Sequence, residues 1–132
     1  MTRTYVDAGV LIAGTRSGGE RGAAALSALA DPDRVFVCSA FVRLELLPKA
    51  VYHRQRDEVA FYEAFFDQVS AWAEPIDRIV ADAEQMAARY GLNALDALHV
   101  AAAVLLGAEE LLTTEEPRKP IHRVTELKVI AI

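Results

Sequence analysis

Cysteine is almost absent from this sequence of 132 residues, in which Cys38 is the only one. A single cysteine excludes an internal disulfide, so a reducing cytoplasm is the simplest setting. Cys38 ends the apolar segment Val35–Cys38. That position favours a small buried hydrophobic side chain over a reactive thiol.

Long apolar runs are also missing. The longest, Val100–Leu106, stops at Gly107 and is too short to cross a bilayer. The first residues enter a strand-like segment without the charged and then apolar pattern of a signal peptide. We therefore expect no membrane-spanning segment and a cytoplasmic location.

An excess of positive charge is the third absence, because 14 basic residues face 19 acidic ones and the net charge is −5. Bulk electrostatic binding of nucleic acid relies on neutralising phosphates, so this balance excludes it. Nucleic acid remains possible as a substrate. Two local basic clusters offer phosphate contacts or are solvated surface: Lys49, His53, Arg54 and Arg56, and Arg118, Lys119, His122 and Arg123.

The hydrophobic pattern alternates between strand-like and helix-like segments. It predicts strands at 4–7, 35–38, 74–76, 111–113 and 127–132, a loop at 15–19, and helices at 21–30, 39–48, 57–72, 77–90 and 93–106. Alternating elements predict a three-layer α/β/α fold around a mostly parallel five-stranded sheet. The length suits a single domain over residues 1–132.

The segment 57–72 carries an aromatic stripe at helical spacing, formed by Phe61, Phe65 and Trp72 together with Val69. Such a stripe is typical of a core-facing helix. It also offers more apolar surface than one core helix usually needs, so we expect a homodimer.

Four acids lie at the ends of, or inside, segments that are apolar enough for the core: Asp7, Glu45, Asp96 and Glu115. Ionised groups are costly there unless they are paired or bind a metal. Ligands of parallel α/β folds gather at the carboxyl ends of the strands, where Asp7 and Glu115 are expected. The four acids therefore predict one divalent-cation site assembled by the fold.

Each of these acids also has an ordinary structural interpretation. Asp7 could simply form a turn. Glu45 could pair with Lys49 one helical turn away. Asp96 follows Asn93 at the spacing of a helix capping box.

The last acid is the least certain, because Glu115 and Glu116 both stand in a loop-like segment and either could point inward. Nearby, Thr113 could orient a water or a phosphate. His99 lies three residues after Asp96 and could be a ligand or a base. A lone histidine on an apolar helix is more often a core residue whose hydrogen bonds are satisfied.

Taken together, four segments resemble the PIN domain family, specifically its small VapC-type toxin nucleases. They are Tyr5–Ile12, Phe41–Leu46, Leu95–Ala103 and Leu111–Glu115, in the family's order and covering essentially the whole chain. Two departures stand out. Gly9 replaces the Ser or Asn common in the family, and Glu115 replaces the usual aspartate.

The resemblance implies an endoribonuclease that hydrolyses phosphodiester bonds with Mg²⁺ or Mn²⁺. Asp7 and Asp96 would be the main metal ligands, Glu45 would hold a water or a second ion, and Glu115 would complete the pocket. Such an ion lowers the pKa of a water and offsets charge in the transition state. The resemblance further implies an RNA substrate and a cognate antitoxin that inserts an arginine among the acids.

Two other functions are compatible with the sequence. A PIN fold that has lost catalysis would serve only for binding, which Gly9 and Glu115 make conceivable. A phospho-receiver domain is also a small acidic α/β module. However, Asp7 stands alone after its strand, and the segment 74–77 is a poor phosphate acceptor site.

Overall fold

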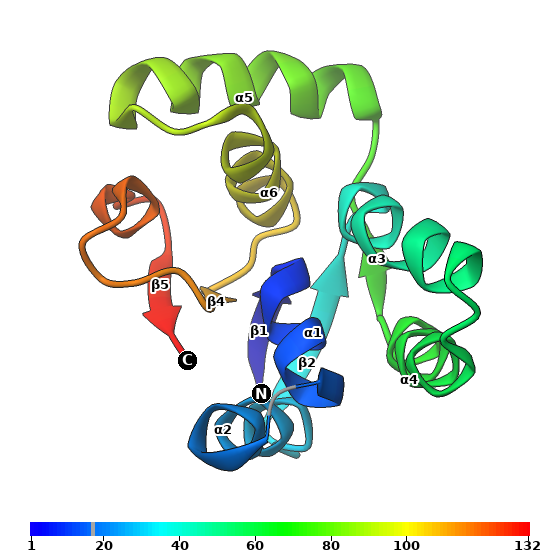
Figure 1. The fold of residues 1–132 in the computed structure, drawn as a ribbon. Coiled ribbons are helices and arrows are strands. Elements are labelled where there is room, and N and C mark those ends of the chain that lie inside the picture. Colours follow the sequence, from blue (N-terminus) through cyan, green and yellow to red (C-terminus); the bar gives the residue numbers. More distant parts are fainter. Residues whose placement is uncertain (17) are drawn as a thin grey trace.

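Five parallel strands form one sheet in the order β3-β2-β1-β4-β5 (Figure 1). The computed structural model describes residues 1–16 and 18–132, so residue 17 of the loop predicted at 15–19 lies outside the description. The strands are β1 (Thr2–Val6), β2 (Arg34–Cys38), β3 (Ala71–Trp72), β4 (Glu110–Thr113) and β5 (Lys128–Ala131). The predicted five-stranded sheet is confirmed, and its strands are all parallel.

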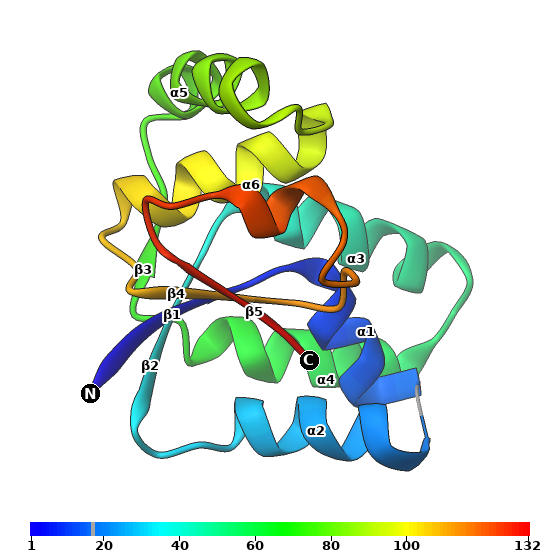
Figure 2. The same cartoon turned by 90° about the vertical axis from the view of Figure 1, so that its left-hand side faces the viewer.

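Helices cover both faces of this sheet (Figure 2). They are α1 (Ala8–Arg16), α2 (Gly19–Leu29), α3 (Ala40–Tyr52), α4 (Arg56–Asp67), α5 (Ile76–Tyr90) and α6 (Ala94–Leu105), with a 3₁₀ turn η1 (Pro120–Arg123) before β5. α6, with α5 stacked on it, lies over one face, whereas α2 and α4 lie against the other. The three-layer α/β/α prediction is therefore also confirmed.

The central strands are buried on both faces, as expected for a parallel sheet covered by helices. Tyr5 and Val6 of β1 and Leu111 and Leu112 of β4 have no exposed surface. In the register of the sheet, Tyr5 lies between Val37 of β2 and Leu111. Because β1 is the middle strand, the residue that follows it emerges at the centre of the sheet edge.

The helix ends near that edge follow local sequence signals. Gly91 stops α5 in the left-handed conformation with a φ of 70°, which glycine adopts without steric cost. Asn93 then caps α6, because its side chain accepts the backbone N–H of Asp96. Both boundaries were predictable from the sequence.

Three predicted boundaries were wrong. The third strand is Ala71–Trp72, not residues 74–76, and the helix predicted at 57–72 ends at Asp67. α3 continues through Pro48 to Tyr52. A proline inside a helix leaves the carbonyl four residues earlier without a partner. Here that carbonyl belongs to Leu44, whose side chain is exposed, so water can serve it.

The aromatic stripe is not a free surface. Phe65 is buried, and Phe61 packs against the core of its own chain. Trp72 lies on β3, where its ring packs on Phe66. Of this stripe only Trp72 stays exposed, at 38%, so the stripe gives the expected homodimer little support, and the homodimer stays a prediction.

The strand order also excludes the phospho-receiver alternative, because receiver domains have the order 2-1-3-4-5. None of the helices in the described part of the chain is both long and apolar enough to cross a membrane.

Candidate functional site

A pocket of about 480 Å³ lies at the carboxyl edge of β1 and β4. It is lined by Asp7, Ala8, Gly9, Ile12, Glu45, Asn93, Leu95, Asp96, His99, Thr114 and Glu115. All four predicted acids are among these residues, although they come from four separate parts of the chain. Lysine and arginine are absent from the lining.

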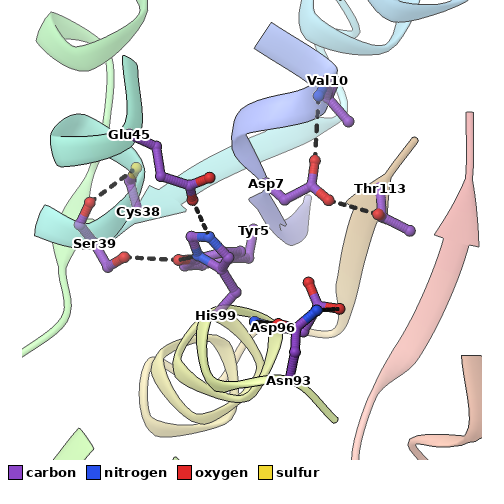
Figure 3. A network of polar contacts seen from close by, with 10 residues as sticks. All are labelled: Tyr5, Asp7, Val10, Cys38, Ser39, Glu45, Asn93, Asp96, His99 and Thr113. Atoms are coloured by element: carbon purple, nitrogen blue, oxygen red, sulfur yellow. Dashed lines mark hydrogen bonds and ion pairs between the residues drawn. The ribbon is translucent and has the colours of Figure 1, made fainter. Parts of the chain in front are cut away.

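Asp7 is the most buried of the four acids, with 8% of its surface exposed. It directly precedes α1, and its Oδ1 accepts the backbone N–H of Val10 at 3.2 Å, as a helix N-cap does. Its Oδ2 accepts the hydroxyl of Thr113 at 2.5 Å (Figure 3). Burial raises the pKa of Asp7 to about 6, against the opposing effect of these hydrogen bonds.

Thr113 orients this carboxylate. Its Oγ1 accepts the backbone N–H of Glu115 at 3.1 Å and donates to Asp7, and the residue is fully buried. The hydroxyl proton is therefore already used. The partner of this proton is a carboxylate of the protein, and the role of Thr113 toward a water or a phosphate stays a prediction.

Asp96 combines both interpretations that its sequence allowed. Its backbone N–H donates to Asn93 at 2.9 Å, and its Oδ2 accepts the Asn93 amide at 3.2 Å, which completes the capping pair. The carboxylate also lines the pocket. Burial raises the pKa of Asp96, and the negative charges of Glu115 and Glu45 raise it further.

Glu45 contacts a histidine instead of Lys49. Its Oε1 lies 2.5 Å from Nε2 of His99, and His99 Nδ1 lies 2.7 Å from the hydroxyl of Tyr5 (Figure 3). That hydroxyl also contacts Ser39 Oγ at 2.7 Å. His99 is thus a buried residue with both ring nitrogens occupied, as the sequence indicated.

Sequence reasoning missed Tyr5 and Ser39. Burial raises the pKa of Tyr5 well above its usual value, so the phenol keeps its proton. Ser39 precedes α3 but makes no capping hydrogen bond with its side chain. A buried tyrosine two residues before Asp7 was the only signal available, and it resembles an ordinary core residue.

The two adjacent glutamates point to different places. Glu115 lines the pocket and is half-buried. Glu116 is exposed and forms an ion pair with Arg118 at 2.7 Å. Glu115 is therefore the acid that belongs to the pocket.

The donors suit a hard divalent cation. Carboxylate oxygens are the ligands that Mg²⁺ and Mn²⁺ prefer. The mutual repulsion of Asp96, Glu115 and Glu45 shows that a positive charge would be favourable among them. Within residues 1–16 and 18–132, no three His, Cys, Asp or Glu side chains converge into a ready-made metal cage. This arrangement fits an ion that keeps several waters and takes only one or two carboxylates.

Gly9 faces a space that is already filled. A Cβ on Gly9 would lie 2.2 Å from Oγ1 of Thr114 and 3.3 Å from Oδ1 of Asp7. The Thr114 hydroxyl therefore occupies the place of a side chain at position 9. A serine there cannot simply add a hydrogen bond to the site.

We accordingly expect Gly9→Ser to destabilise the protein by about 1–3 kcal/mol, the usual cost of overpacking, and not to tighten Mn²⁺ binding. Adding Thr114→Ala should recover most of that loss, because it removes the clashing hydroxyl. Thermal unfolding of the wild type, both single variants and the double variant measures this coupling. Tighter Mn²⁺ binding by Gly9→Ser with Thr114 intact would contradict it.

Comparison with known proteins identifies the family and the fold. Residues 4–125 match the family model of the PIN domain. A search of curated proteins finds no match. Among solved structures, the chain is similar to VapBC2 from Rickettsia felis bound to a DNA fragment from their promoter, with 13% identity, a TM-score of 0.74 and 99% of each chain covered.

Two further structures are similar over nearly their whole length. VapBC-1 from nontypeable Haemophilus influenzae has 17% identity and a TM-score of 0.68, with 98% of each chain covered. FitAcB from Neisseria gonorrhoeae has 20% identity and a TM-score of 0.65, with 96% of this chain and 95% of that chain covered. These likenesses establish the shared fold. With a family model matched along nearly the whole sequence and four acids at the carboxyl edge of the sheet, the chain belongs to the PIN domain family.

Proposed function

We propose that this protein is a divalent-metal-dependent endoribonuclease and the toxin of a toxin–antitoxin pair in the cytoplasm. The supporting observation is the pocket itself. Four carboxylates from separate elements share it, and no lysine or arginine of the lining balances them. Membership of the PIN domain family adds a second line of support.

In the proposed mechanism, Asp7 and Asp96 would hold the ion, while Glu45 and Glu115 would act through water or a second ion. When bound, Mg²⁺ or Mn²⁺ supplies an acidified water and offsets the charge that develops on the phosphodiester. The protein's own part is orientation. Thr113 fixes Asp7, and Asn93 fixes Asp96, so these carboxylates need little reorganisation.

The proposed substrate is RNA, contacted by basic residues beside the pocket. η1 follows the pocket segment directly, and Nε2–H of His122 donates to the backbone carbonyl of Glu115 at 2.9 Å. Lys119 precedes η1 and is half-buried. Both residues follow Glu115 closely in the sequence, and we place them as contacts for phosphates of the substrate. Their small number fits a chain with a net charge of −5.

Purified protein tests the proposal directly. RNA cleavage should require Mn²⁺ or Mg²⁺ and stop when a chelator removes the ion. A protein that has lost catalysis would instead bind RNA without cutting it, whether or not metal is present. Cleavage that persists unchanged in chelator would contradict the metal requirement.

The proposed partner is a cognate antitoxin, in keeping with the similar VapBC and FitAcB structures. A cluster of carboxylates is best complemented by arginine, whose planar fork can contact two oxygens at once. We place that arginine between Asp7, Glu45 and Asp96. The exposed apolar residues of α3, Leu44, Val51 and Tyr52, offer a surface for the rest of such a peptide or for a homodimer.

We expect that co-expression with the neighbouring upstream reading frame abolishes toxicity and yields a complex in pull-down. Changing the inserted arginine of that partner to lysine should weaken inhibition, because lysine offers no bidentate fork. Cleavage of RNA by each purified complex is the measurement. If the chain copurifies with nothing and is harmless when expressed alone, the toxin assignment fails.

A further inference from the structure

A chain of buried hydrogen bonds connects the pocket to the interior of the sheet. It runs from Ser39 through Tyr5 and His99 to Glu45 (Figure 3). Ser39 and Tyr5 have no exposed surface, and His99 has only 3%. Glu45, the last residue of the series, is the one that presents a carboxylate to the pocket. The four residues come from β1, α3, α6 and the residue just before α3, so this series of hydrogen bonds exists only in the folded protein.

The direction of each hydrogen bond follows from the groups involved. A carboxylate can only accept, so His99 Nε2 carries the hydrogen and donates it to Glu45. In the neutral ring Nδ1 is then an acceptor and takes the hydroxyl hydrogen of Tyr5. The Tyr5 oxygen remains free to accept from Ser39. Both ring nitrogens of His99 thus have a partner, and the Glu45 carboxylate sets the tautomer, to which the Tyr5 hydroxyl is complementary.

We propose that His99 is a positioning residue that directs Glu45 into the pocket, with its ring held in place by Tyr5 and, through Tyr5, by Ser39. This proposal rests on the metal site of the proposed function. Glutamate has several freely rotating bonds, and Glu45 has no partner from its own helix in the described residues. One oxygen is held by His99, which leaves the other oxygen free to face an ion or its water. Residues that orient metal ligands in this way typically change metal affinity 10- to 100-fold when altered.

Two substitutions of His99 separate orientation from packing. The amide nitrogen of His99→Gln can reach the place of Nε2, so it retains the donor to Glu45. His99→Asn is too short for this and can only replace Nδ1. We expect His99→Gln to bind Mn²⁺ within a few fold of wild type and to keep most of the cleavage rate. His99→Asn should bind Mn²⁺ at least about tenfold more weakly by titration calorimetry.

A tyrosine pair provides the matched control. Tyr5→Phe removes the hydroxyl that holds the ring at Nδ1 but leaves the donor to Glu45, so it should give an affinity between those of the two His99 variants. Tyr90→Phe removes a hydroxyl of α5 that contacts Thr125 and Glu126, outside the pocket. It should leave Mn²⁺ affinity unchanged. Thermal unfolding without metal shows whether each variant is folded.

A measurement without metal separates this proposal from the proposed function. The wild-type proton NMR spectrum should contain a protected imidazole N–H resonance, lost in His99→Asn and shifted in Tyr5→Phe. If wild type shows this signal but binds no Mn²⁺, the proposed metal site is wrong, whereas the hydrogen bonds from Ser39 to Glu45 are confirmed. Absence of the signal would overturn the positioning role. The positioning role would also be overturned if His99→Asn bound Mn²⁺ like wild type, or if His99→Gln and His99→Asn lost the same affinity for Mn²⁺.

Discussion

Asp96→Asn should lower RNA cleavage at least about a hundredfold, the scale of losing one preorganised electrostatic group. The fold should persist, because an asparagine oxygen can still accept the Asn93 amide and the backbone N–H of residue 96 still donates to Asn93. The loss should therefore be one of metal binding and not of structure. Titration calorimetry with Mn²⁺ and an RNA cleavage assay measure the two effects separately.

Stability should move in the opposite direction to activity. Burial, and after it repulsion from Glu115 and Glu45, raises the pKa of Asp96, so removing its charge relieves the metal-free protein. A loss of up to about 1 kcal/mol from the helix dipole opposes this gain. We expect an unfolding temperature at or above that of wild type in chelator. Full activity of the variant would contradict the role assigned to Asp96.

Asp77→Asn is the matched control. Asp77 is also an aspartate in the first turn of a helix, but it is exposed and lies outside the pocket. The same substitution there loses a similar interaction with a helix dipole. It should change neither cleavage nor Mn²⁺ affinity, so a loss confined to Asp96→Asn reports on the pocket.

The second large effect is that the contribution of Asp7 to the stability of the metal-free protein should be lost as the pH rises from about 4 to about 6. Asp7 has a pKa of about 6 when folded and near 3.8 when unfolded, so the folded state binds the extra proton in this window. Stability from this proton is present below pH 3.8 and is lost as pH rises through 6. A pKa shift of this size corresponds to a change in the free energy of unfolding on the order of 3 kcal/mol.

Comparison with Asp7→Asn isolates this contribution from that of other acids. The difference in unfolding free energy between the variant and wild type should grow with pH up to about 6 and then level off. Added Mn²⁺ should restore the stability that the wild type loses above pH 6. It should have little effect below pH 5, where a proton occupies the Asp7 carboxylate. A difference that does not vary with pH would contradict the raised pKa.

Local signals in the sequence explain the correctly predicted parts of the fold. Asn93 and Gly91 act through their own neighbouring backbone, so a short window of sequence contains the whole cause. The β1 and β4 segments are apolar because both faces of the sheet are covered. β3 was misplaced because its two residues are too few to show a periodicity, and the preceding aromatic residues continue a helical spacing into it.

The candidate site likewise contains residues that the sequence indicated and contacts that it could not indicate. Asp7 and Asp96 could be selected because a charge stands beside apolar segments. The contact of His99 with Glu45 could not, since 54 residues separate them along the chain. Nor could the sequence show that the Thr114 hydroxyl fills the space beside Gly9. Such contacts depend on the packing of distant elements, which no local pattern encodes.

The order of the chain has a consequence for synthesis on the ribosome. The pocket needs Asp7 from the beginning of the chain and Thr113 and Glu115 from near its end. Until β4 emerges, β1 lacks its neighbour on one side and Asp7 lacks the hydroxyl that orients it. Any activity of this pocket therefore begins only after Thr113 and Glu115 have been made and β4 has paired with β1.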